Sequence, residues 1–193
     1  MKKLAILASL FISLSAQAQL VRIHKLNDCS DYAIEQTQKT IEKYFGLQVM
    51  VSEKNYSTSD NSESIDCLDL NESLFGYRNF QFKKSKPIDI FLTTSNINSV
   101  KRQTNIGEDE ITYEKVNVNG VSFGNSIYIK TLDISKLKFT IIHELSHSFG
   151  AEHCQNICIM NVEYTLKQRE KIWDYAKDKP IFCKNCRIQS KIK

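Results

Sequence analysis

The residues best suited to chemistry gather in one short segment, HELSHSFGAEHC, which runs from His143 to Cys154. The chain has four histidines, and three of them fall inside this segment. A glutamate follows the first of these histidines directly, and a cysteine follows the last. Because imidazole nitrogens and thiolates are the ligands that zinc prefers in proteins, the segment predicts a metal site with a carboxylate beside it.

A helix would bring the first two histidines together. His143 and His147 are four residues apart, so a helix places their side chains on one face, one above the other. Two imidazoles in this position can bind one zinc ion from a single turn. Glu144 points slightly away from that ion, so it can reach a water molecule held there without being a ligand. This HExxH arrangement indicates a metallohydrolase with Glu144 as its general base.

A third ligand must come from beyond the helix. Gly150 can adopt a positive φ and turn the chain sharply, after which His153 can return towards the metal. Three histidines leave the fourth tetrahedral position of zinc open for water, which is typical of catalytic rather than structural zinc sites. The pattern H-E-x-x-H-x-x-G-x-x-H fixes five positions, so it is far more specific than HExxH alone.

The extended pattern resembles that of the metzincin metalloproteases, and the cysteines that follow it resemble those of the archaemetzincin family. The shared features are a cysteine directly after the third histidine, a C-x-M motif and a downstream C-x-x-C motif: Cys154, Cys158 with Met160, and Cys183 with Cys186. The resemblance implies that Cys154, Cys158, Cys183 and Cys186 bind a second, structural zinc ion. It also implies that Met160 forms an apolar floor beneath the histidines. The resemblance is specific from His143 to Cys186.

Two spacings depart from the usual archaemetzincin pattern. Three residues separate Cys154 from Cys158, one fewer than usual, and the 22 residues between Met160 and Cys183 are more than usual. The extra length fits an enlarged helix. The alternative is that the thiols form disulfides, Cys183–Cys186 or Cys154–Cys158. We favour zinc, because a site of four thiolates buries its charge on the metal and holds the C-terminal segment against the active site.

The elements that position these residues alternate between α and β. The expected strands are Val21–Leu26, Leu47–Ser52, Ile88–Thr94 and Val121–Thr131, the last interrupted at Gly124 and Asn125 by a turn or bulge. The expected helices are 31–45, capped by Ser30 and ended by Gly46; 134–149, capped by Asp133 and ended by Gly150; and Thr165 to about Asp178. With the resemblance, this order predicts an α/β (α+β) fold of the metzincin-like zincin type. A mixed, mostly parallel sheet would pack on the active-site helix, with a small C-terminal subdomain around the second zinc.

The start of the chain predicts export. Lys2 and Lys3 precede an apolar run, Leu4–Leu14, that is short for a membrane span, and Ala16 and Ala18 supply the A-x-A cleavage positions. We therefore expect a signal peptide over residues 1–18 and a single metalloprotease domain over 19–193, in the periplasm or secreted. The alternative is an uncleaved N-terminal anchor. After cleavage we expect a monomer without membrane contact.

Composition excludes some partners. The chain has 193 residues, of which 41% are hydrophobic and 25% charged, as in an ordinary globular domain. The net charge of +4 is mild, and the basic residues are scattered among acidic ones, so we expect no nucleic-acid binding. The two remaining cysteines, Cys29 and Cys67, predict one disulfide in an exported protein; the alternative is two buried free thiols.

These observations favour zinc-dependent hydrolysis of peptide bonds in a peptide or protein substrate, with two Zn²⁺ per chain. Metzincin substrates lie extended beside an edge strand, for which Val121–Thr131 is the candidate here; the alternative is an ordinary internal strand. Tyr164 is a candidate donor to the oxyanion, with a core or surface tyrosine as the alternative. Two other classes compete: a non-catalytic, zinc-stabilised peptide-binding module, and a thiol–disulfide protein that uses Cys183 and Cys186. Glu144 argues against the first, and the missing thioredoxin-like context against the second.

Overall fold

The computed structural model describes residues 19–57, 64–75, 83–104, 111–156, 158–161 and 182–190. Three predicted features lie outside these residues: the signal peptide of residues 1–18, the helix from Thr165 to Asp178, and Tyr164. In the part of the chain that is described, none of the helices is long and apolar enough to cross a membrane.

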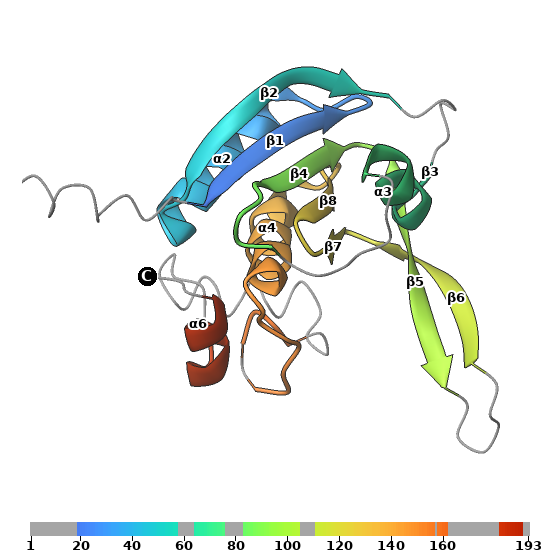
Figure 1. The fold of residues 1–193 in the computed structure, drawn as a ribbon, viewed down its shortest axis with the longest axis vertical. Helices are drawn as coiled ribbons and strands as arrows, with labels where there is room; N and C mark the ends of the chain where they lie inside the picture. Colours follow the sequence, from blue (N-terminus) through green and yellow to red (C-terminus); the bar gives the residue numbers. More distant parts are fainter. Residues whose placement is uncertain are drawn as a thin grey trace, which may run out of the picture.

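The centre of the molecule is a five-stranded sheet with the strand order β2-β1-β4-β8-β7 (Figure 1). Its strands are β1 (Leu20–Leu26), β2 (Gln48–Tyr56), β4 (Ile88–Thr93), β7 (Gly120–Phe123) and β8 (Ser126–Lys130). Neighbouring strands are parallel except for β7, which runs antiparallel to β8. Every residue of β4 is buried, as expected for a central strand that is covered on both faces. The predicted mixed, mostly parallel sheet is therefore confirmed.

Two helices cover one face of this sheet: α2 (Asp31–Phe45) and α4 (Ile134–Ser148). Both begin as their sequences predict, because the Ser30 side chain accepts a hydrogen bond from the backbone N–H of Ala33, and the Asp133 side chain accepts one from Ser135. Alternate strand residues such as Ile23 and Ile90 pack with the apolar faces of both helices in one core cluster. This core holds α4 in place relative to the sheet.

The opposite face of the sheet carries a second, smaller core. Here α3 (Cys67–Phe75) packs with a three-stranded sheet of order β3-β5-β6, formed by β3 (Ser64–Asp66), β5 (Asn96–Thr104) and β6 (Ile111–Val118). None of the predicted strands lies between Thr94 and Val121. In Figure 1, β5 and β6 instead form a long antiparallel hairpin that extends away from the main sheet.

The predicted disulfide between Cys29 and Cys67 is wrong. Both are free thiols, and they belong to hydrophobic clusters on opposite faces of the main sheet. Cys67 is fully buried, whereas Cys29 is half-buried. Burial raises the pKa of both thiols, so they behave as small apolar side chains, as the alternative of two free thiols described.

Candidate metal centre

Helix α4 carries His143, Glu144 and His147 in its C-terminal half. Its residues Leu137, Ile141 and Leu145 are buried in the core, as predicted, and this leaves the histidines on another face. His143 and Glu144 are themselves buried, with exposed fractions of 7% and 8%. Both side chains are therefore in contact mainly with other protein atoms and have little contact with solvent.

The three histidines converge on one point through their Nε2 atoms. The distances are 3.1 Å between His143 and His147, 3.2 Å between His143 and His153, and 3.0 Å between His147 and His153. Around a tetrahedral zinc at ordinary bond lengths, ligand nitrogens are about 3.3 Å apart. The spacing therefore fits a single zinc ion.

The other ring nitrogens fix the two helical histidines. His143 Nδ1 lies 3.0 Å from the carbonyl oxygen of Ile159, and His147 Nδ1 lies 2.7 Å from that of Ala151. A carbonyl accepts but does not donate, so each Nδ1 carries the proton and each Nε2 presents a lone pair. Burial also lowers the pKa of His147, which favours the neutral, metal-binding form. The lone pairs of His143 and His147 therefore face one another, an arrangement that suits a bound cation.

The turn after α4 delivers the third histidine. The backbone N–H of Gly150 donates to His147 O and that of Ala151 donates to Ser146 O, which closes the last turn of the helix. Gly150 has a φ of 89°, a left-handed conformation that glycine adopts without the cost other residues pay. The chain then reverses and brings His153 back towards α4, as the H-x-x-G-x-x-H spacing predicts.

Strand β7 passes unusually close to α4. A Cβ atom at Gly120 would lie 2.5 Å from Thr140 Cγ2 and 2.9 Å from Glu144 Cγ. Only glycine fits at this crossing, so Gly120 sets how near the strand lies to the Glu144 carboxylate. We did not predict a role for Gly120, since the pair Asn119-Gly120 indicates no more than a turn when the sequence is considered alone.

Strand β7 forms one edge of the sheet. Val121–Thr131 was the candidate edge strand, and the predicted turn at Gly124 and Asn125 divides it into β7, which is the edge, and β8, which is internal. The Lys130 N–H donates to Asn119 O, and hydrogen-bonded pairs alternate along antiparallel strands. Gly120 and Ser122 therefore direct their backbone N–H and C=O groups to the free edge.

A cleft of about 620 Å³ lies between this edge and the histidines. One side is lined by the three histidines and Glu144, and the other by β7 residues Gly120, Val121 and Ser122 together with Gly124. An extended peptide on the β7 edge would thus pass directly over the three-histidine group. Met160, the predicted floor of the site, is fully buried next to Ile159; its role beneath the histidines stays a prediction.

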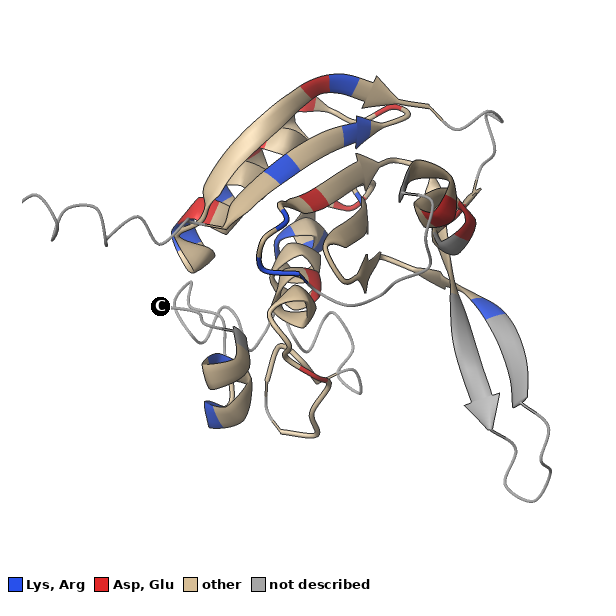
Figure 2. Cartoon of the chain, viewed as in Figure 1, with Lys and Arg blue, Asp and Glu red and all other residues tan. Residues whose placement is uncertain are grey.

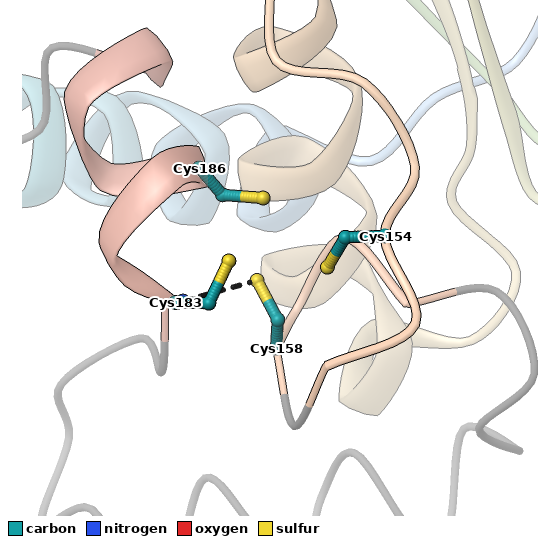
Figure 3. A group of neighbouring side chains, drawn as sticks. All are labelled: Cys154, Cys158, Cys183 and Cys186. Atoms are coloured by element: carbon teal, nitrogen blue, oxygen red, sulfur yellow. Dashed lines mark hydrogen bonds between the residues drawn. The ribbon is translucent and has the colours of Figure 1, made fainter.

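The four C-terminal cysteines form a second group. Their Sγ atoms all lie within 4.8 Å of one another, and none is in a disulfide. Figure 3 shows the side chains pointing towards a common centre, with Cys154 and Cys158 on the turn after α4 and Cys186 on the short helix α6 (Lys184–Ser190). The Cys183 N–H donates to Cys158 Sγ at 3.3 Å. Burial raises the pKa of Cys158 and Cys186, so a bound dication is what would keep all four as thiolates.

The fold, the three-histidine group and the four-cysteine group together fit the class of zinc metallopeptidases. The sequence profile of Peptidase family M54 matches residues 90–192, more than half of the chain. The chain therefore belongs to Peptidase family M54, the archaemetzincins, and the resemblance that its motifs indicated is confirmed. No curated protein sequence matches the chain.

Solved structures agree on the fold. An archaemetzincin from Methanopyrus kandleri superimposes with a TM-score of 0.56 at 15% identity, covering 92% of this chain and 97% of its own. An archaemetzincin from Archaeoglobus fulgidus, solved in complex with malonate, gives a TM-score of 0.54 at 17% identity, covering 89% of this chain and 99% of its own. At these identities the likeness concerns the fold, and it confirms the predicted α/β architecture.

Proposed function

We propose that this chain hydrolyses peptide bonds as a zinc metallopeptidase, with the catalytic zinc held by His143, His147 and His153 and with Glu144 as the general base. Membership of Peptidase family M54 supports metallopeptidase activity. The observation that carries the residue assignment is the convergence of three Nε2 atoms beside Glu144, in a cleft bordered by an edge strand. We assign Cys154, Cys158, Cys183 and Cys186 to a structural zinc.

The residues around the cleft have separate tasks. A zinc ion at the three histidines would polarise the scissile carbonyl and make a water molecule more acidic. Glu144 accepts the proton of the attacking water and passes it to the leaving amine. Its buried side chain, packed beside Gly120, keeps the carboxylate at one position through both transfers. His143 and His147 stay neutral, because each donates its single N–H to a backbone carbonyl.

The edge of β7 aligns the substrate. Gly120 and Ser122 offer two backbone N–H donors and two C=O acceptors, which match the repeat of an extended peptide. Such pairing involves the peptide backbone and not its side chains. Peptides of many sequences can therefore bind in the same register relative to the metal site. The close approach at Gly120 then sets the distance between the peptide backbone and Glu144.

Replacement of Glu144 by glutamine tests the proposal. Glutamine has the same shape but cannot take a proton, so E144Q should keep its zinc and lose hydrolysis by about a hundredfold or more. The measurement is mass spectrometric detection of products from a mixed peptide library, together with the zinc content of both proteins. If E144Q cleaves within a few-fold of the wild type, Glu144 is not the base.

Export is part of the proposal. The n-region, apolar run and A-x-A site of residues 1–18 support a cleaved signal peptide and a periplasmic or secreted enzyme. Expression of the full chain in a bacterial host tests this. The mature protein should be found outside the cytoplasm with Gln19 as its N-terminal residue. A chain that still begins with residues 1–18 would contradict cleavage.

A further inference from the structure

A basic turn lies directly before β4. It contains Lys83, Lys84 and Lys86, all exposed, and it is closed by a hydrogen bond from Lys86 N–H to Lys83 O at 3.0 Å. Neither Lys83 nor Lys84 forms an ion pair with any residue in the described part of the chain. Their charges are therefore available to a partner in solution.

The side chain of Asn125 fastens this basic turn to the β7–β8 turn. Its Nδ2 donates to the carbonyl oxygens of Lys83, Lys86 and Pro87 at 3.0, 3.1 and 3.2 Å. Its Oδ1 accepts from Lys83 N–H at 2.6 Å, and its backbone oxygen accepts from Asp89 N–H at 2.7 Å. The four contacts of the Asn125 side chain hold the basic turn at a fixed place, and its backbone oxygen is bonded to the start of β4.

That place is one end of the cleft. Because β4 and β8 are parallel, both begin at the same end of the sheet, and α4 runs back from β8 so that its histidines lie at that end too. Gly124, next to Asn125, lines the cleft itself. In Figure 2 the blue basic turn lies at the start of β4, on the side of the C-terminal half of α4. The basic turn therefore lies beside the β7–β8 turn, whose Gly124 lines the cleft.

We propose that Lys83 and Lys84 form a subsite for acidic side chains of the peptide substrate, an inference that rests on the proposed function of the cleft. Each residue of a strand advances about 3.3 Å, and Gly120, beside Glu144, is four residues from Gly124. A peptide aligned with β7 thus brings the side chains two to four positions from the scissile bond to the basic turn. An exposed lysine attracts a carboxylate only modestly, so the subsite selects among substrates and takes no part in the chemistry.

Paired peptides test the subsite. Each pair carries Glu or Gln at one position two to four residues from a bond that the wild type cleaves in a mixed library. Both termini are blocked, so that side chains supply the only carboxylates. We expect kcat/KM to be about threefold to tenfold higher for the Glu peptide, mainly through KM, and the preference to shrink at high salt. K83A/K84A should lose the preference, and K83E/K84E should reverse it, while both cleave the Gln peptide within about twofold of the wild type.

The double substitution K39A/K43A is the matched control. It removes two exposed lysines from α2 and should leave the preference unchanged. Binding of the same peptides to E144Q, followed by fluorescence anisotropy, separates this proposal from the proposed function. Equal hydrolysis of Glu and Gln peptides by the wild type overturns the subsite and leaves the peptidase. If the wild type cleaves no peptide of the library, Glu and Gln versions of library peptides are compared by binding alone, and tighter binding of the Glu versions that K83E/K84E reverses supports the subsite and overturns the peptidase. A preference that survives in K83E/K84E overturns the subsite.

Discussion

At the scale of single residues, the three histidines are held in different ways. His143 and His147 are oriented by the helix and by the carbonyls of Ile159 and Ala151. His153 lies on the irregular turn that follows Gly150 and is exposed. Its position near the other two depends on that turn. Loss of His153 should therefore affect the zinc more than the fold.

His153→Ala should weaken binding of the catalytic zinc and abolish most hydrolysis while the protein stays folded. Loss of one of three ligands removes a bond to the ion, and neither α4 nor the cysteine group is touched. Zinc content after dialysis against a mild chelator, circular dichroism and peptide hydrolysis measure the three effects. Full zinc content together with full activity would show that His153 is not a ligand.

The residues that sequence could predict are those whose roles depend on local spacing. His143, Glu144 and His147 lie within about one turn of α4, and Gly150 begins the reversal that leads to His153, so their grouping follows from local chain geometry. The roles of Gly120 and Asn125 depend on contacts with distant parts of the chain. Gly120 packs against Glu144 on α4, and Asn125 is hydrogen-bonded to the Lys83–Pro87 segment. Such contacts depend on the packed fold, which no short pattern specifies.

At the scale of elements, one turn connects the two candidate metal sites. His153 faces the other histidines, and Cys154, its neighbour, belongs to the cysteine group. The Cys154 N–H donates to Met160 O at 3.2 Å, which closes the loop between them. Because Ile159 in this loop also contacts His143 Nδ1, a zinc on the cysteines would stabilise the loop that orients two of the three histidines.

Substitution of Cys183 and Cys186 by serine should remove the zinc that the four cysteines bind. It should also weaken binding of the zinc at the three histidines. Without four thiolates the C-terminal segment loses its link to the turn, so both thermal stability and affinity for the catalytic zinc should fall. Metal analysis and thermal unfolding measure this, with Cys29→Ser as the control outside the cysteine group. Wild-type protein with one zinc and with the four cysteines oxidised in pairs would contradict the second site.

Whether an element can be predicted depends on the pattern of apolar and polar residues in its sequence. Strand β4 is mostly apolar, with Ile88, Ile90, Phe91 and Leu92, and α2 and α4 have caps and apolar faces, so these elements were correctly predicted. The strands of the β5–β6 hairpin are rich in polar and charged residues, so they lack the alternation that identifies a half-buried strand. The prediction of a Cys29–Cys67 disulfide was wrong because the sequence does not specify on which face of the sheet each thiol lies.

At the scale of the whole molecule, a buried charge cluster joins two central strands. Asp89 on β4 accepts hydrogen bonds at 2.7 Å from Arg22 Nε and Nη2, and lies 2.7 Å from His24 Nε2, both residues being on β1. Burial alone would raise the pKa of Asp89, but the hydrogen bonds from His24 and Arg22 outweigh it and hold the pKa below its ordinary value. The ionised carboxylate therefore stabilises the fold.

Asp89→Asn should lower the free energy of unfolding at pH 7 by about 2–4 kcal/mol, because Arg22 and His24 lose their charged partner. Since the folded state depresses the pKa of Asp89, its contribution is present above the unfolded pKa of about 4 and is lost as the pH falls through the folded value. The difference in thermal midpoint between wild type and variant should therefore shrink below about pH 4. Asp31→Asn, at an exposed ion pair, should lower the stability much less than Asp89→Asn does. A difference that does not change with pH would contradict this account.

The central claim is that the three-histidine group is a catalytic zinc site, and metal titration tests it most directly. The purified protein should carry two zinc ions per chain by mass spectrometry under native conditions. A strong chelator should abolish cleavage of the peptide library, and cleavage should return in proportion as zinc is added back to the wild type, but not to E144Q. If protein stripped of all zinc cleaves peptides as fast as the loaded protein, the claim is wrong.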